Sequence, residues 1–165
     1  FRRFFKPSNE MQDFRACDGV EEAIKMVGQS FQSHNIEIAV AKSREPCDVT
    51  GYPNEFAQVV LNALTNAKDA IADKKIAGKV QIRIEKGTDM AILSIRDNGG
   101  GIPENILPKI FDPYFTTKEK GTGIGLYMSK MIMDNMGGDI SISNIEGGTE
   151  VSIRVPLAHP ISPST

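Results

Sequence analysis

The sequence has no tryptophan, only two cysteines and only two histidines among its 165 residues. Cys17 and Cys47 lack the paired spacing of a zinc site or a disulfide framework, so we expect a reducing, cytoplasmic setting. No apolar run approaches the roughly twenty residues of a membrane-spanning helix, and the charged start "FRRFFKPSNE" has no apolar signal-peptide core. The net charge is only −2, with both signs spread along the chain. We therefore expect neither a nucleic-acid partner nor a membrane contact.

A length of 165 residues is typical of one domain. Apolar residues make up 40% and charged residues 24% of the chain, which are ordinary values for a globular protein. The sequence does not begin with Met, and we expect it to be a piece of a longer protein. We expect residues 1–18 to be a connecting segment, residues 19–157 the folded domain and residues 158–165 a flexible tail.

Hydrophobic periodicity predicts a mixture of helices and hairpins. Apolar residues recur at helical spacing in the segments 19–33, 54–73 and 124–135. They alternate with polar residues in the segments 36–40, 79–86, 90–97, 139–144 and 149–156. Turns at 87–89 and 145–148 join the last four strands into two hairpins. The order predicts an α+β fold, a two-layer α/β sandwich whose mixed, mostly antiparallel sheet is covered on one face by about three helices.

The helix predicted over 54–73 carries a continuous polar stripe opposite its apolar face. The stripe residues recur at steps of three and four: Glu55, Gln58, Asn62, Asn66 and Asp69. A solvated face is the commonest fate of such a stripe. Asn in a helix interior costs roughly half a kcal/mol against Ala, however, and a solvated face usually recruits Lys, Glu and Arg instead. Amide and carboxylate oxygens suit a hard cation, so Mg²⁺ is the other interpretation.

The strand 90–97 ends on Asp97, which is followed at once by Asn98, three glycines, Ile and Pro. By alternation Asp97 shares a side with Leu93 and Ile95, the side that we assign to the core. An ionised carboxylate there accepts hydrogen bonds only and needs a donor, for which the exocyclic amine of adenine is suitable. "DNGG" is also good turn chemistry, in which the Asp begins a turn. From these residues alone the two interpretations stand about equal.

A second glycine cluster, "GTGIGL" at 121–126, precedes the helix predicted over 124–135. Glycines let backbone N–H groups approach phosphate oxygens, and a helix N-terminus favours anions. The spacing fits neither a Walker A loop nor a dinucleotide fingerprint, because the Lys-Ser/Thr pair and the third spaced glycine are missing. Alone this motif is a weak signal, but it follows the Asn stripe and the Asp97 segment in order.

Four motifs in this order and spacing resemble those of one superfamily. "LNALTNAKDA", "DNGGGIP", "IFDPYFTTK" and "GTGIGL" are similar to its N, G1, F and G2 boxes. Over about residues 19–157 the sequence resembles the ATP-binding catalytic domain of bacterial sensor histidine kinases, in the Bergerat-fold (GHKL) superfamily. "TNAKDA" and "FDPYFTTK" resemble the nitrogen-regulation-like class of these kinases. The resemblance implies an α/β sandwich, in agreement with the periodicity.

The resemblance also implies a role for each motif residue. Asp97 would bind the adenine amine, with Thr149 joining through water, and Asn66 would be the Mg²⁺ ligand. Asn62 would lie close to the phosphates as a catalytic residue, and Lys118, in a short lid, would supply positive charge near the terminal phosphate. The other ATP-binding positions would shape the pocket floor, anchor the covering loop or contact the phosphates: Gly99, Gly101, Phe111, Phe115, Thr117, Gly121, Thr122, Gly123, Gly125 and Leu126.

The implied cofactors are ATP and Mg²⁺, and the implied partners are a dimerisation domain that carries the phosphoacceptor His and, indirectly, a response regulator. That His lies in an H-E-x-x-[NT]-P-like motif in the family, and neither His34 nor His159 matches it. The connecting segment 1–18 would lead from that missing domain. We therefore expect a chain that binds Mg-ATP, does not phosphorylate itself alone and is monomeric.

Two alternatives differ in class. The first alternative is another GHKL member: an ATPase, a chaperone or an anti-sigma-type serine kinase. The ATPase branches place a Glu base where this chain has Asn62, and an amide cannot take a proton. A nucleotide-free interaction module is the other, and intact Asn66, Asp97 and "GTGIGL" argue against it. Many of the kinases carry Lys where this chain has Asp69, which is a departure from the commonest pattern.

Overall fold

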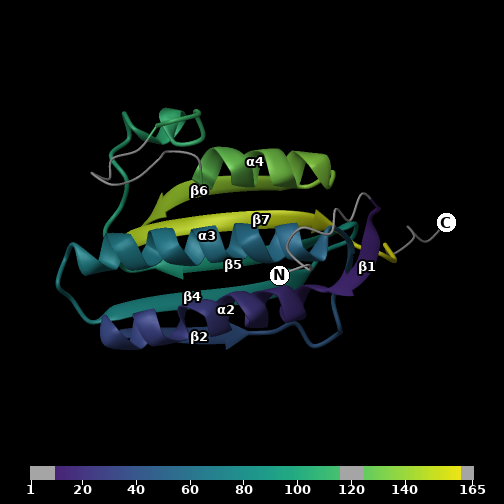
Figure 1. Ribbon diagram of the computed structural model, residues 1–165, viewed down its shortest axis with the longest axis horizontal. Coiled ribbons are helices and arrows are strands. Elements are labelled where there is room, and N and C mark those ends of the chain that lie inside the picture. Colours follow the sequence, from purple (N-terminus) through teal and green to yellow (C-terminus); the bar gives the residue numbers. More distant parts are fainter. Residues whose placement is uncertain (1–9, 116–124, 161–165) are drawn as a thin grey trace.

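The computed structural model describes residues 10–115 and 125–160. Its central sheet has five strands in the order β2-β4-β5-β7-β6 (Figure 1). These strands are β2 (Ile36–Ala41), β4 (Gly78–Lys86), β5 (Met90–Asp97), β6 (Asp139–Ile145) and β7 (Gly148–Pro156). The helices are α2 (Ala16–Ser33), α3 (Pro53–Ala72) and α4 (Gly125–Asn135), with a 3₁₀ turn, η1 (Leu107–Lys109).

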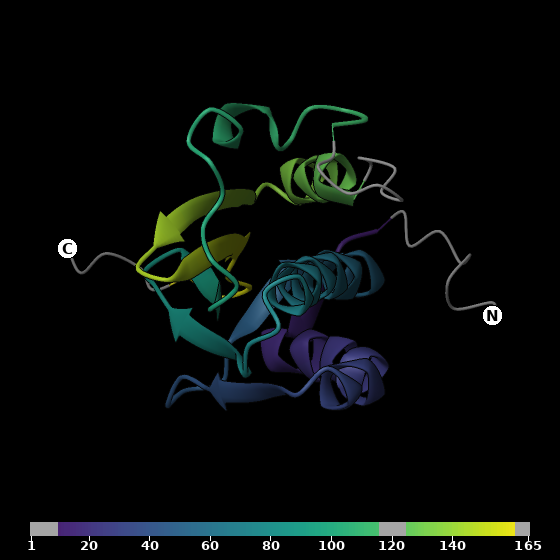
Figure 2. The same cartoon turned by 90° about the vertical axis from the view of Figure 1, so that its left-hand side faces the viewer.

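The strand pairing makes the sheet mixed but mostly antiparallel. β2 pairs with β4 in parallel, whereas β4–β5, β5–β7 and β6–β7 are antiparallel. The parallel pair is joined through α3, as a crossover connection requires. Seen from the end, the three helices lie on one side of the sheet (Figure 2). The expected α+β sandwich, with three helices on one face, is confirmed.

The core lies between the sheet and these helices. β4 alternates strictly, with Val80, Ile82 and Ile84 buried and their neighbours exposed. α3 buries its apolar face against the sheet, and Phe56 and Leu64 are fully buried. Burying side chains of this size contributes about 2 kcal/mol each, so the apolar face of α3 determines the position of its polar stripe.

Local signals set the ends of the two helices nearest the polar stripe. Pro53 opens α3, where its missing N–H costs nothing, and the first-turn N–H of Phe56 bonds to Tyr52 O at 2.8 Å. α4 ends at Asn135, shortly before a glycine pair: Gly137 has φ +76°, and Gly138 N–H donates to Met133 O at 2.9 Å.

Two short strands were missed by the sequence pattern. β1 (Gln12–Arg15) pairs antiparallel with β3 (Asp48–Gly51) in a separate two-stranded sheet. The Phe14 ring packs against Phe56, with the centroids 5.5 Å apart. Residues 12–18, expected in a connecting segment, therefore form β1 and the first residues of α2. Four residues of mostly exposed strand carry too little alternation to be recognised.

The end of the described chain is also attached to the fold. Val49 of β3 forms an isolated bridge with Leu157, and Ala158 N–H donates to Asp48 O at 2.9 Å. Residues 157 and 158, on either side of the expected boundary between domain and tail, therefore both contact β3. Among residues 10–115 and 125–160, the helices lack the combination of length and apolar character that crossing a bilayer requires.

Candidate functional site

The polar stripe of α3 becomes more buried along the helix. Glu55 and Gln58 are exposed, whereas Asn62, Asn66 and Asp69 are half-buried. A solvated face would stay exposed along its whole length. The second half of the stripe therefore faces other parts of the molecule, which favours the interpretation as a site.

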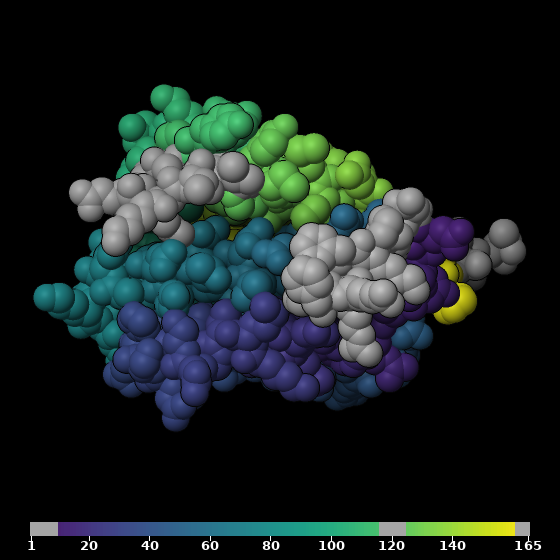
Figure 3. Space-filling view, viewed as in Figure 1, coloured from purple at the N-terminus to yellow at the C-terminus, as the bar shows by residue number. Residues whose placement is uncertain are grey.

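Asn62 connects α3 to the beginning of α4. Its Nδ2 lies 3.4 Å from Gly125 O and 3.3 Å from Ser129 Oγ, and its Oδ1 accepts from Gln58 Nε2 at 3.0 Å. Ser129 is buried, with 1% of its surface exposed. The two helices form adjacent bands in the space-filling view (Figure 3). The Asn stripe and the last glycine of "GTGIGL" are thus side by side.

Asp97 lies on the core side of β5, as the alternation predicted. Leu93 and Ile95 on the same side are fully buried, and Asp97 itself is half-buried at the strand end. Burial raises the pKa of its carboxyl, and backbone hydrogen bonds from Gly99 and Thr149 act in the opposite direction. The Gly99 N–H donates to Asp97 Oδ1 at 2.9 Å, two residues on, which is an Asx turn. The sequence allowed two interpretations of Asp97, as the start of a turn or as an inward carboxylate, and in the structure both apply.

The glycines after Asp97 are required by their neighbours. A Cβ on Gly99 would lie 2.9 Å from Ala70 C and Cβ and from Ile71 N, so this glycine lets the loop rest on α3. Gly100 has φ +83°, and its N–H donates to Gly147 O at 3.1 Å. The N–H groups of Gly99 and Gly100 therefore both donate hydrogen bonds within the protein. Thr149, opposite Asp97 in the β5–β7 register, lies 3.4 Å from Gly100 O through its Oγ1.

Two asparagines that the sequence reasoning missed hold the loop from both sides. Asn98 accepts from Lys79 N at 2.8 Å and donates to Ala77 O at 3.0 Å. Asn144 accepts from Ile102 N and donates to Ile102 O, both at 2.7 Å. For Asn144 a signal existed: it follows Ile140 and Ile142 at alternate positions of β6, where the pattern calls for an apolar residue, and it is exposed near the end of the strand.

The remaining expected residues divide into two groups. Phe111 packs against the core, Phe115 is half-buried, and Gly125 and Leu126 are half-buried in the first turn of α4. Lys68, which neighbours the stripe residue Asp69 in sequence, donates to Ser30 Oγ at 3.1 Å and so points to α2, away from the stripe. The last group lies outside the described residues: Thr117, Lys118, Gly121, Thr122 and Gly123.

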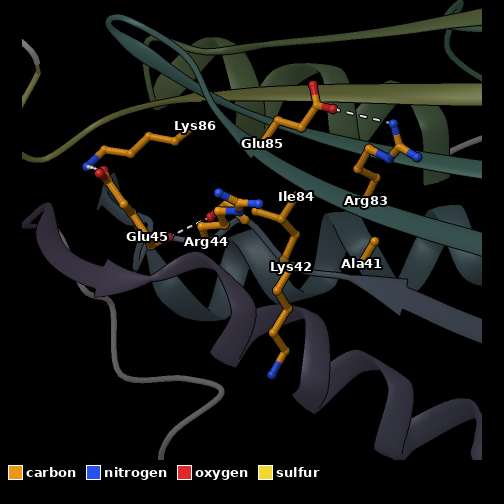
Figure 4. A pocket seen from close by; sticks show the side chains of 9 residues that line it. Ala41, Lys42, Arg44, Glu45, Arg83, Ile84, Glu85 and Lys86 are labelled. Carbon is orange, nitrogen blue, oxygen red and sulfur yellow. Dashed lines mark hydrogen bonds and ion pairs between the residues drawn. The ribbon is translucent and has the colours of Figure 1, made fainter.

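A shallow basin of about 610 Å³ lies elsewhere, beside the β2–β3 connection (Figure 4). Its charged residues are largely paired with each other: Lys86 Nζ lies 3.3 Å from Glu45, and Arg83 Nη1 lies 3.6 Å from Glu85. The basin is near the β4–β5 turn, whereas Asp97 pairs with Val80 close to the other end of β4. It contains none of the expected site residues.

Comparison with known proteins gives a consistent result. The model of one family, the histidine kinase-, DNA gyrase B-, and HSP90-like ATPases, matches residues 51–159. The two-component sensor PprA of Pseudomonas aeruginosa is 34% identical over 161 residues, 94% of this chain and 18% of that protein. The sensor histidine kinase ZraS of Salmonella typhimurium is 34% identical over 155 residues, 92% of this chain and 33% of that protein. The chain thus spans a third or less of the length of these relatives.

Solved structures are similar as well. The catalytic domain of histidine kinase ThkA, in a nucleotide-free form, is 30% identical with a TM-score of 0.82, over 89% of this chain and 95% of that one. A structure of ThkA in complex with the response regulator protein TrrA is 25% identical with a TM-score of 0.75, over 94% of this chain and 45% of that one. The similarity therefore extends over nearly the whole described chain.

Proposed function

This chain belongs to the family of histidine kinase-, DNA gyrase B-, and HSP90-like ATPases, and from that premise we propose that it is the ATP-binding catalytic domain of a sensor histidine kinase. In this proposal it binds Mg-ATP and delivers the γ-phosphate to a His on a separate dimerisation domain of the same parent protein. The sensor kinases among its relatives support this choice within the family.

One observation carries the proposal: three motifs that are distant in sequence meet on α3. Asn62 contacts Gly125 of "GTGIGL", and Gly99 of "DNGGG" rests on Ala70 one turn beyond Asn66. Asp97 holds Gly99 through its carboxylate. A bound nucleotide needs a hydrogen-bond acceptor for its base, N–H groups for its phosphates and a ligand for its cation, all within the length of the nucleotide. These three motifs supply one each.

Asp97 is the proposed adenine acceptor. An inward, half-buried carboxylate at a strand end favours a ligand that brings an N–H donor into an otherwise apolar place. Thr149 lies opposite it and is buried, with its hydroxyl 3.4 Å from Gly100 O, so it remains the proposed second polar group beside Asp97. Gly99, Gly101, Phe111 and Phe115 remain the proposed walls and cover of the pocket.

The phosphates are proposed to lie between Asn62, Asn66 and the start of α4, where a helix N-terminus favours anions. Asn66 fits a magnesium site by its chemistry, since Mg²⁺ binds through one or two protein oxygens and keeps waters and phosphate oxygens for the rest. When bound, the ion would neutralise charge on the β- and γ-phosphates. Lys118 and the glycines of the lid remain part of the proposal as predictions.

The phosphoacceptor is proposed to lie outside this chain. His34 is the C-cap of α2, with its Nδ1 2.8 Å from Ser30 O, and His159 is exposed near the end of the described residues. Neither stands in an H-E-x-x-[NT]-P-like motif. A response regulator is the proposed indirect partner, by analogy with the ThkA complex.

The proposal is tested by titrating the chain with Mg-ADP in a calorimeter. We expect the wild type to bind and Asp97→Ala to lose at least tenfold in affinity, about 1.4 kcal/mol. Asp89→Ala is the matched control, because Asp89 is an exposed carboxylate at the β4–β5 turn. No binding by the wild type, or no loss in Asp97→Ala, would contradict the proposal. Rapid ATP turnover by the chain alone would favour an ATPase instead.

A further inference from the structure

The nucleotide-facing loop after Asp97 is held by the β6–β7 hairpin as well as by its own strand. We propose that Asn144 is a positioning residue for this loop: its amide fixes the backbone of Gly101 and Ile102 in the form that accepts the nucleotide. The inference rests on the proposed function, since it gives a role to a residue outside the expected binding set.

The contact is a two-point clamp. The Asn144 side-chain amide accepts from Ile102 N and donates to Ile102 O, both at 2.7 Å. One side chain therefore satisfies both polar backbone groups of one loop residue, as a paired strand would do. A Cβ on Gly101 would lie 2.9 Å from Asn144 Oδ1, so the loop backbone passes directly over the amide.

The sheet register places this clamp in line with the base acceptor. Asn144 pairs with Thr149, and Thr149 pairs with Asp97, so the three residues form one row across β6, β7 and β5. Asp97 holds the loop at Gly99, and Asn144 holds it three residues later at Ile102. The two side chains thus fix both ends of the segment that would form the pocket wall.

Fixing matters here because of the sequence of the loop. Three successive glycines, 99–101, have more conformations available than any other tripeptide, and ordering them costs free energy. When only a fraction of molecules holds the competent loop, apparent affinity falls by that fraction although every direct contact remains. Asn144 raises the competent fraction without touching the nucleotide.

The test uses Asn144→Ala and the isosteric Asn144→Asp, whose carboxylate can accept from Ile102 N–H but cannot donate to Ile102 O. Ser143→Ala is the matched control, because Ser143 is the exposed neighbour on the other side of β6. Mg-ADP affinity is measured by calorimetry well below the unfolding transition. Amide hydrogen exchange of Ile102 and the unfolding midpoint are measured without nucleotide.

We expect at least a tenfold loss of Mg-ADP affinity in both Asn144 variants, faster exchange at Ile102, and wild-type behaviour in Ser143→Ala. A purely structural role would lower the unfolding midpoint but leave the affinity of the folded variants unchanged, and that result would overturn the inference. Unfolding of both variants would also overturn it, since the residue would then serve stability. If the wild type itself does not bind Mg-ADP, the proposed function fails. That outcome is distinct from failure of the Asn144 inference alone, in which the wild type binds and the variants bind equally well.

Discussion

Asn62 on α3 and Ser129 on α4 meet through a contact of 3.3 Å between Nδ2 and Oγ, and Ser129 is almost completely buried there. Side chains of two helices far apart in sequence thus share one polar contact beside the first residue of α4. The contact links the position of the Asn stripe to that of the helix that follows the glycine motif.

The first prediction concerns that contact. Ser129→Ala should lower the free energy of unfolding by about 1 kcal/mol, because the Nδ2 of Asn62 loses a buried partner and keeps only the longer contact to Gly125 O. Urea unfolding measures the change. Ser141→Ala, at an exposed position of β6, is the control and should be neutral. Equal stability of Ser129→Ala and wild type would show that the contact contributes nothing.

A second prediction follows from the raised pKa of Asp97, whose ordinary value is 3.8. Since the folded chain binds this proton more tightly than the unfolded chain, the associated stability is complete below 3.8 and is lost as pH rises through the folded pKa. Asp97→Asn stays neutral and retains an acceptor for the Gly99 N–H. Its unfolding free energy relative to wild type should therefore increase from acid to neutral pH, while Mg-ADP binding is lost.

Chemical denaturation of both proteins across that pH range measures the effect. A difference between them that stays constant with pH would show that burial does not control the Asp97 carboxyl. Asp89→Asn provides the comparison for an exposed carboxylate.

The third prediction compares two glycines. Gly99→Ala should destabilise the fold by about 1–3 kcal/mol, because the new methyl group meets the backbone of α3, which cannot yield easily. Gly28→Ala is a matched substitution inside α2, with nothing within 4 Å of the new Cβ. It should stabilise the protein by roughly 0.5–1 kcal/mol through helix propensity. Thermal or urea unfolding distinguishes the opposite signs, and equal signs would refute the packing argument.

The fourth prediction concerns phosphorylation. Incubated alone with γ-labelled ATP, the chain should acquire no acid-labile label, because His34 and His159 lie outside any phosphoacceptor motif. Mass spectrometry of peptides containing each histidine makes the measurement. Stable label on either residue, absent from the Asp97→Ala variant, would place the acceptor within this chain.

The central elements could be predicted because their signals are local. Helical spacing predicted α3 from residue 54, one residue after its observed start at Pro53. Strict alternation predicted β4, and alternation also placed Asp97 on the inner side of β5. Burial of an apolar face enforces each of these patterns, so the sequence carries them directly.

Other features depend on partners that are remote in sequence. β1 and β3 pair with each other, and strands of four residues are too short for alternation to be recognised in the sequence. Gly99 is required by its close approach to Ala70, and Asn144 by its hydrogen bonds to the backbone of Ile102. The only local sign of the Asn144 contact was a polar residue after two apolar residues at alternate positions of β6. For Gly99, the turn motif "DNGG" concealed the packing against α3.

The small sheet of β1 and β3 gives the molecule a path for mechanical load. Gln12, where β1 begins, pairs with Gly51, and only Tyr52 separates Gly51 from Pro53 at the start of α3. Tension applied to the chain before Gln12 therefore reaches α3 through the four residue pairs of β1 and β3, and it reaches α2 directly, because α2 follows Arg15 without a gap. The helix that carries Asn62 and Asn66 is thereby mechanically connected to the chain that enters β1, although β1 lies outside the five-stranded sheet.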